Sequence, residues 1–171
     1  MSYRIELAVE RDVPRIRELM VLSRELLPDP DWFVDDDEAY LLRHIRLEGY
    51  ILKYMQDDRC SGYLMVHKPG FDKSNLGAHL HLPLREYPSV THMESTCVDP
   101  VCRGQGIFRI LMHAAVEKER MDPATKYLMG TVHPQNVYSK RIFLEEGFHI
   151  LETTLKYGGK IRDIMVLQLR D

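Results

Sequence analysis

The stretch VDPVCRGQGIFRILM, residues 98–112, constrains the fold more than any other part of the chain. It leads from an apolar, strand-like segment through two glycines into residues that recur at helical spacing. The N–H groups of such a turn and of the first helical turn are not used by the helix itself. Together with the positive end of the helix dipole they suit an anion, phosphate above all. The sequence therefore predicts a strand, an anion-binding turn and a helix.

Length and composition narrow the class of protein. The 171 residues are of the size of one domain, 1–171. A net charge of −3 and scattered basic residues argue against a nucleic-acid partner. Three cysteines without a CxxC pair fit a reducing compartment, the cytoplasm. A helix that spans a membrane needs ~20 consecutive apolar residues, and no apolar run approaches that length, so we expect no membrane partner.

Hydrophobic spacing predicts an α/β (α+β) fold with helices on the faces of a mixed sheet. The turn at residues 103–106 then lies at the carboxyl end of a central strand, where open sheets bind ligands. The irregular excursion 68–88 is a candidate lid or binding loop. The predicted elements are strand 3–8, helices 13–27 and 38–47, two strands around Asp57-Asp58, strand 92–98, helix 107–120, strand 127–133, helix 136–146, and strands 148–157 and 162–169.

Two segments carry a resemblance to a known family. ESTCVDPVCRGQGIFRILM is similar to the strand, Arg/Gln-x-x-Gly-x-Gly/Ala turn and helix of the GNAT superfamily of acyl-CoA-dependent N-acetyltransferases. About thirty residues later, HPQNVYSKRIFLEEGF is similar to that family's Asn-containing helix ending in Gly-Phe. The resemblance covers nearly the whole chain. It implies a mixed sheet of about seven strands with an antiparallel N-terminal meander and splayed central strands, and acetyl transfer from acetyl-CoA to a primary amine without a metal.

The resemblance also implies which residues hold coenzyme A. The main chain of Thr96, Cys97 and Val98 would meet the pantetheine arm, and Asn136 would contact the cofactor near the gap between the Cys97 and Val132 strands. From the residues alone, Asn136 is more often a plain helix cap, a role that is compatible with binding a ligand. The competing interpretation of the two glycines is a tight connection between strand and helix. The pyrophosphate would lie on backbone N–H groups of Arg103, Gly104, Gln105, Gly106, Ile107, Phe108 and Arg109.

The chemistry requires a proton acceptor, because an alkyl amine with a pKa near ~10.4 is almost wholly protonated at pH 7. Glu94 is the predicted general base, since it lies two residues before Thr96 on the same strand face and relatives often carry a carboxylate there. A solvated or salt-bridged carboxylate is the competing interpretation. His92 shares the face and is the reserve base.

Two positions depart from the family pattern. Phe143 stands where many relatives carry a tyrosine that protonates the departing thiolate, and Phe108 stands where the signature has Gly or Ala. Both favour the alternative of a non-catalytic acyl-CoA-binding sensor. Tyr138 is the nearest phenol in sequence, but five helical residues turn it by ~140° from Phe143, so we expect it on another side of the helix.

The acceptor side is less determined. Aromatic and acidic residues in DWFVDDDEAY, residues 31–40, suit a cationic small-molecule or peptide amine, although acidic residues also favour helix N-termini in general. A homodimer is left open. A phosphate-binding nucleotide hydrolase is disfavoured because no Lys-Ser/Thr follows the glycines. His79-x-His81, with His92 beyond, suggests a metal site that lacks a convincing carboxylate.

Overall fold

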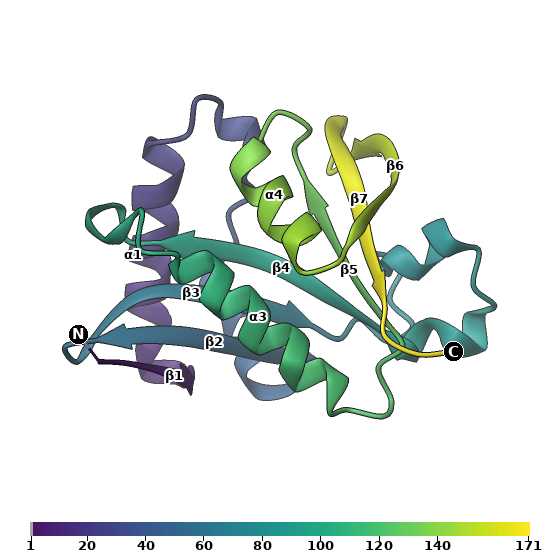
Figure 1. Cartoon of the computed structure of the whole chain (residues 1–171), viewed down its shortest axis with the longest axis horizontal. Helices are drawn as coiled ribbons and strands as arrows, with labels where there is room; N and C mark the ends of the chain where they lie inside the picture. Colours follow the sequence, from purple (N-terminus) through teal and green to yellow (C-terminus); the bar gives the residue numbers. More distant parts are fainter. Residues whose placement is uncertain (1) are drawn as a thin grey trace. The chain divides into compact units, whose positions relative to one another are not determined.

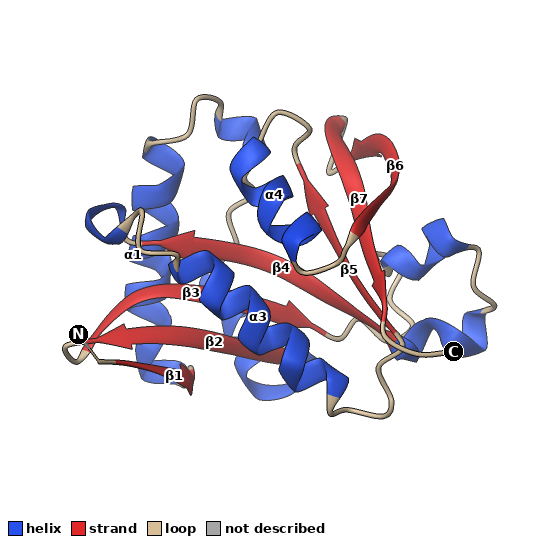
Figure 2. Ribbon diagram, viewed as in Figure 1, coloured by secondary structure: helices blue, strands red, loops and turns tan. Residues whose placement is uncertain are grey.

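The computed structural model describes residues 2–171, and among them seven strands form one mixed sheet in the order β1-β2-β3-β4-β5-β7-β6 (Figures 1 and 2). The strands are β1 (Tyr3–Leu7), β2 (Gly49–Gln56), β3 (Arg59–His67), β4 (Val90–Val98), β5 (Tyr127–Val132), β6 (His149–Lys156) and β7 (Lys160–Gln168). The α-helices are α1 (Val13–Glu25), α2 (Glu38–Arg43), α3 (Ile107–Arg120) and α4 (Val137–Glu145). The predicted mixed sheet of about seven strands is confirmed.

The chain forms two compact units. The first consists of the chain up to Val66 and of Ser95–Ala115, and the second of His67–Glu94 and Val116–Asp171. The boundary therefore cuts β4 after Glu94 and α3 after Ala115. The single domain 1–171 stays a prediction.

The first unit packs α1 against its strands. The buried side chains of α1 recur three or four residues apart, as an amphipathic helix requires. Asp12 precedes α1, but its carboxylate accepts hydrogen bonds from the Val9 N–H and the Lys53 ammonium instead of capping the helix. Figure 1 shows α1 behind the strands of this unit and the start of α3 in front of them. The core contains Val13, Ile16, Leu19, Met20, Leu41, Ile51, Tyr63, Met65 and Cys97.

The second unit contains the whole ladder between β4 and β5. These strands pair in parallel from Val90↔Tyr127 to Met93↔Gly130. On its other edge β5 stays paired with β7 as far as Val132↔Asp163. The pairing of β4 with β5 ends at Met93, although β4 continues to Val98. Such an end of the pairing is what splayed central strands require. Glu94 is the first residue of β4 beyond this last pair.

The excursion 68–88 differs from the irregular loop that the sequence predicts. It contains a 3₁₀ helix at Leu76–Leu80 and the start of another at Leu84–Ser89. Leu76 packs into the core of the second unit with Val90 and Met129. The segment is therefore part of the packed structure around β4 and β5. None of the helices in the described part of the chain has the length and apolar character needed to cross a membrane.

Candidate active site

The turn between β4 and α3, Arg103–Arg109, is called the glycine turn below. Gly104 and Gly106 have φ of +79° and +74°, in the left-handed region that favours glycine. A Cβ added at either would meet no heavy atom within 4 Å, so the backbone conformation and not crowding requires glycine there. The ladder of α3 starts where the Ile110 N–H donates to the Gly106 carbonyl at 3.0 Å. The N–H groups ahead of that bond are outside the ladder and can serve an anion.

Asp99 anchors the start of this turn, and sequence reasoning missed it. Its N–H donates to the Ser61 carbonyl at 2.8 Å, and its carboxylate accepts from the Val101 N–H and from the guanidinium groups of Arg15 and Arg59. Burial acts to raise the pKa of Asp99, but these donors hold it below its ordinary value. The only signal in the sequence is Asp-Pro before a helix, a common way to start a turn.

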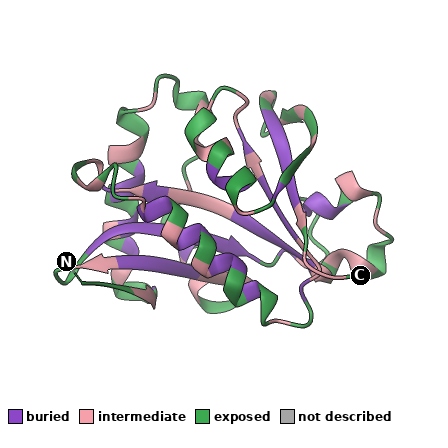
Figure 3. Cartoon of the chain, in the orientation of Figure 1, coloured by how far each residue is buried: buried purple, intermediate pink, exposed green. Residues whose placement is uncertain are grey.

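The side chains of the glycine turn divide into two groups. Ile107 and Phe108 are buried, whereas Arg103, Gln105 and Arg109 are exposed. Figure 3 shows that buried and exposed segments alternate along the helix that follows. The Phe108 ring, only 8% exposed, therefore packs inward and does not crowd the outer side of the turn. The departure from Gly or Ala at this position is thus compatible with an anion at the turn.

Cys97 is the central residue of the strand end Thr96–Val98. Its side chain is buried, and its sulfur accepts a hydrogen bond from the Tyr63 hydroxyl at 3.4 Å. Burial raises the pKa of the Cys97 thiol to about 11. A buried thiol with such a pKa is a poor nucleophile, so the site offers no support for an acetyl-cysteine intermediate at Cys97. Thr96 and Val98 are partly exposed on the opposite face of the strand.

Glu94 lies in the second unit in contact with two histidines, and these three residues are called the imidazole–carboxylate cluster below. Its Oε1 is 3.0 Å from Nδ1 of His67 and 3.6 Å from Nδ1 of His92. Burial acts to raise the pKa of Glu94, but the hydrogen bonds from the two imidazoles outweigh burial and hold it well below its ordinary value. Glu94 is therefore a carboxylate at any pH near neutrality.

The hydrogen bonds of His92 fix its tautomer. The Leu76 N–H donates to its Nε2 at 3.0 Å, so this nitrogen carries the lone pair and Nδ1 carries the proton that faces Glu94. Burial lowers the pKa of His92, although the carboxylate opposes that shift. Because its lone pair is engaged by a backbone donor, His92 is poorly suited to the role of reserve base.

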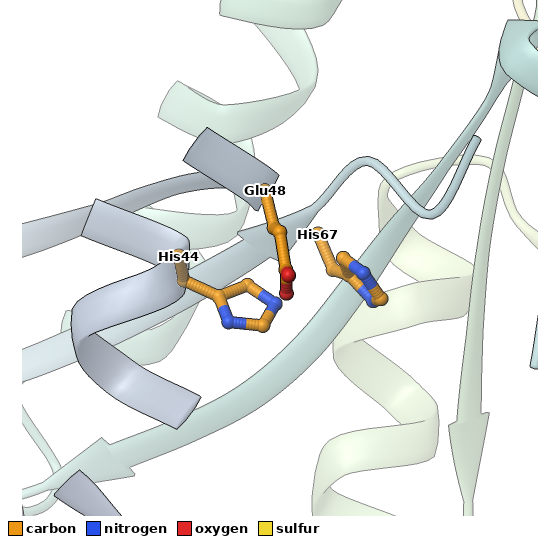
Figure 4. Close-up of side chains that lie close together, drawn as sticks. All are labelled: His44, Glu48 and His67. Carbon is orange, nitrogen blue, oxygen red and sulfur yellow. The ribbon is translucent and has the colours of Figure 1, made fainter. Parts of the chain in front are cut away.

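His67, His92 and Glu94 also have the residue types and proximity of a metal site. A metal on Nδ1 of His92 would move the ring proton to Nε2, against the Leu76 N–H, so the observed hydrogen bond disfavours that use. Figure 4 shows the His67 imidazole at the end of β3, drawn with His44 and Glu48 of the first unit.

The His79-x-His81 interpretation fails for a different reason. Among the described residues, neither histidine belongs to a group with metal-ligand proximity. His79 instead contacts Glu152 through Nδ1, and Lys156 Nζ lies 3.4 Å from its Nε2.

Comparisons with known proteins agree with this geometry. The model of the acetyltransferase (GNAT) family matches residues 14–148 and so includes parts of both units. The chain belongs to the acetyltransferase (GNAT) family. A comparison with curated proteins found no match to its sequence.

Solved structures confirm the GNAT fold. The yncA protein of Salmonella typhimurium, solved with its cofactor acetyl-CoA, is 19% identical with a TM-score of 0.74, over 100% of this chain and 96% of that one. The ribosomal-protein-S18-alanine N-acetyltransferase of Escherichia coli is 13% identical with a TM-score of 0.74, over 99% and 96%. The aminoglycoside acetyltransferase AAC(6')-Ib, solved with coenzyme A and kanamycin, is 17% identical with a TM-score of 0.70, over 98% and 95%.

In this GNAT chain, three residues considered in the sequence lie at or in α4: Asn136, Tyr138 and Phe143. Asn136 is its N-cap, since its side chain accepts from the Ser139 N–H at 3.2 Å. Phe143 is buried and packs edge to face on Phe148, with centroids 4.9 Å apart. Tyr138 is half exposed, so it and Phe143 face different sides of α4 as expected. Phe143 is a core residue here, and a hydroxyl added to its ring would have to be buried.

The segment 31–40 is largely used by the fold itself. Asp37 caps α2 by accepting from the Tyr40 N–H at 2.7 Å. Asp35 forms an ion pair with Arg24, and Phe33 packs against the core of the first unit. The general preference of acidic residues for helix N-termini therefore accounts for Asp37 without an amine ligand.

Proposed function

We propose that the chain is an N-acetyltransferase that moves the acetyl group of acetyl-CoA to a primary amine by direct attack. The observation that carries the proposal is the glycine turn, whose left-handed Gly104 and Gly106 leave backbone donors outside the ladder of α3, in a chain of the GNAT family. The same match spans both units, which supports one domain over 1–171. Acetyl-CoA supplies an activated thioester whose thiolate is a good leaving group.

Coenzyme A is assigned to the main chain of the first unit and to Asn136. Backbone N–H groups of the glycine turn hold the pyrophosphate, and the exposed Arg103 and Arg109 add positive charge. The main chain of Thr96–Val98 pairs with the pantetheine arm in the way a further strand would. Asn136 contacts the cofactor in addition to capping α4.

Proton removal is assigned to Glu94 and the imidazoles it binds. An attacking amine must lose a proton as its C–N bond forms, and Glu94 is the anionic group that the fold holds at the point where β4 leaves its register with β5. No side chain is assigned to protonate the thiolate. Phe143 has no acidic proton, and Tyr138 faces another side of α4.

The acceptor is proposed to be a small-molecule or peptide amine. Structures with the same fold include enzymes named for ribosomal-protein S18 alanine and for aminoglycosides, and one for phosphinothricin. The three thiols of this chain are free, which fits the cytoplasm as its location. A homodimer is the assembly we would test first, by light scattering of the purified protein.

The test combines binding with turnover. Acetyl-CoA at millimolar concentration is expected to raise the melting temperature, because a ligand of the native state stabilises it by mass action, and ATP is expected to act less. Release of the coenzyme A thiol is then followed with kanamycin, an alanine-ended peptide, phosphinothricin and a polyamine. A shift with ATP alone overturns the cofactor assignment. A higher melting temperature with acetyl-CoA, without thiol release with any amine, favours the acyl-CoA-binding sensor. Phe143, which has no hydroxyl to protonate the thiolate, is consistent with that alternative.

A further inference from the structure

Three consecutive residues of β3, Cys60, Ser61 and Gly62, contact the groups that hold the glycine turn, and they are called the β3 platform below. They are buried, and like the glycine turn they belong to the first unit. The Ser61 carbonyl accepts from the Asp99 N–H at 2.8 Å. Asp99 directly follows Val98, the last residue of β4. The platform therefore fixes the place where the chain leaves the sheet and enters the turn.

The carboxylate of Asp99 binds two different parts of the first unit. Its Oδ1 accepts from the Val101 N–H at 3.2 Å, while the Asp99 carbonyl accepts from the Cys102 N–H at 2.8 Å. Its Oδ2 accepts from the guanidinium groups of Arg15 and Arg59. One oxygen thus binds the chain that leads into the glycine turn, and the other binds α1 and the start of β3.

Arg15 connects this carboxylate to the platform. Its Nε donates to the Cys60 carbonyl at 3.0 Å, and its guanidinium donates to Asp99 and, at 2.6 Å, to Glu18. The Arg15 side chain is only 19% exposed, whereas that of Arg59 is 61% exposed. Salt and water screen an exposed pair more than a shielded one. Arg15 is therefore the cation that holds Asp99 more firmly.

The far side of the turn rests on the same platform through Gly62. A Cβ at Gly62 would lie 2.9 Å from Cγ2 of Ile107 and 3.2 Å from the Cys97 carbonyl oxygen. Ile107 is the first residue of α3, which starts in front of β3 in Figure 1, and it is 1% exposed. Its side chain occupies the space that the glycine leaves open. The chain is thus held on both sides of Gly104 and Gly106 by three residues of β3.

We propose that Asp99, Arg15 and Gly62 are positioning residues of cofactor binding, which fix the glycine turn on the β3 platform in the orientation that a pyrophosphate requires. The inference rests on the proposed function, in which backbone N–H groups of the turn hold the pyrophosphate of coenzyme A. Hydrogen bonds weaken steeply when the donor turns away from the acceptor, so a turn that shifts on its platform loses affinity for the phosphates. The three residues act through the turn.

The first test compares two buried carboxylates of the first unit. Asp99→Asn keeps an oxygen for the Val101 N–H but removes the charge that the guanidinium groups bind. Asp12→Asn is the matched control, because Asp12 accepts from the Lys53 ammonium at 3.0 Å and from the Val9 N–H and is not part of the platform. In calorimetric titrations of folded protein, we expect the Kd of coenzyme A to rise about tenfold in Asp99→Asn and less than about twofold in Asp12→Asn.

The outcomes of this titration separate the inference from the proposed function. If the wild type binds coenzyme A and Asp99→Asn binds it equally well, the positioning role is overturned and the cofactor assignment stands. Equal losses in Asp99→Asn and Asp12→Asn also overturn the role, since a general loss of stability then accounts for both. A wild type that binds no coenzyme A overturns the proposed function and the positioning role together.

The second test asks whether the loss belongs to the phosphates. S-acetylpantetheine carries the thioester and the pantetheine arm without the pyrophosphate. For Asp99→Asn we expect KM for acetyl-CoA to rise about tenfold with kcat nearly unchanged, and kcat/KM for S-acetylpantetheine to stay within about twofold of the wild type. Equal losses with the two donors contradict a role that acts through the turn.

The third test uses the contact between Gly62 and Ile107. Gly62→Ala puts a methyl group against Cγ2 of Ile107, so we expect the Kd of coenzyme A to rise about tenfold or more. Leucine has similar volume but no methyl group on Cβ. Adding Ile107→Leu to Gly62→Ala is therefore expected to restore the Kd to within about threefold of the wild type. Losses that multiply in the double variant contradict this contact as the support of the turn.

Discussion

The glycine turn of the first unit and the imidazole–carboxylate cluster of the second unit differ in the groups that form them. The turn uses the backbone, and the cluster uses side chains. The turn consists of neighbouring residues, and its binding groups are backbone N–H groups whose direction follows from the left-handed Gly104 and Gly106. The cluster joins residues 67, 92 and 94, and the backbone donor at Leu76, through side-chain hydrogen bonds. The turn therefore tolerates change in side chains but not in backbone conformation, whereas the cluster depends on the identity of each side chain.

The largest effect is expected from the cluster. Glu94→Gln keeps the shape of the side chain but removes its charge and its basicity, both of which the proposed proton removal requires. We expect kcat to fall by about 10²–10⁴-fold with acetyl-CoA affinity nearly unchanged. Steady-state kinetics and a binding titration measure the two effects. Full activity across pH 6 to 9 would remove Glu94 from the mechanism.

Gly130 is a glycine that close packing requires, in contrast to the glycines of the turn, which backbone conformation requires. A Cβ there would lie 2.8 Å from two ring carbons of Phe143 and 3.0 Å from the Met93 carbonyl oxygen. Gly130→Ala is expected to lower the free energy of unfolding by about 1–3 kcal/mol, because a packed core does not accept an added methyl. Urea unfolding measures the loss.

A second variant checks the cause of that loss. Phe143→Leu added to Gly130→Ala is expected to recover part of it, since the two positions are in contact and their effects do not add. Additive losses contradict the contact as the cause.

The pH dependence of stability tests the buried imidazole of the cluster. Burial lowers the pKa of His92 below its ordinary value of 6.5, so below that pH the unfolded chain binds a proton that the folded chain does not. His92 therefore makes stability fall as the pH falls below 6.5, by at most about 1.4 kcal/mol per pH unit for one proton. His92→Gln is expected to show a shallower slope in urea unfolding between pH 5.5 and 7. Parallel slopes in the two proteins contradict the assignment.

The glycine turn is tested by a matched pair of substitutions. Gly104 and Gly158 have nearly the same φ, +79° and +77°, and both would point a Cβ into open space. An alanine at either is expected to cost about 1 kcal/mol of strain. Only Gly104→Ala is expected to weaken acetyl-CoA binding, by about fivefold, because a backbone that relaxes this strain turns its N–H groups away from the phosphate. Equal affinities for the two variants argue against the turn as the phosphate site.

The smallest effect is expected at Tyr138, which belongs to neither region. It is 51% exposed on α4, whereas Phe143 of the same helix is buried. Tyr138→Phe is expected to change stability by no more than about 0.5 kcal/mol and kcat by no more than a few-fold. A loss of two orders of magnitude in kcat, in a folded variant that still binds acetyl-CoA, would show that Tyr138 supplies the proton to the thiolate.

The sequence by itself predicts the elements, the mixed sheet, the family and the glycine turn. These depend on short-range patterns: helical and strand spacing, the order of elements, and glycines between a strand and a helix. Glu94 is within reach of the same reasoning, because alternation along one strand places it on the face of Thr96. Asn136 as the cap of α4 is equally local, since a cap and its helix are neighbours in sequence.

The tertiary structure decides what surrounds those residues. It shows that Phe108 points inward and that Phe143 is part of the core, since burial depends on which elements pack together. It brings His67 to Glu94 from 27 residues away, and the Leu76 N–H to His92 from 16 residues away. No local pattern marks such partners, because hydrogen bonds between separate elements follow from strand pairing and loop packing. The hydrogen-bonding of Glu94 and His92 follows from these contacts between elements.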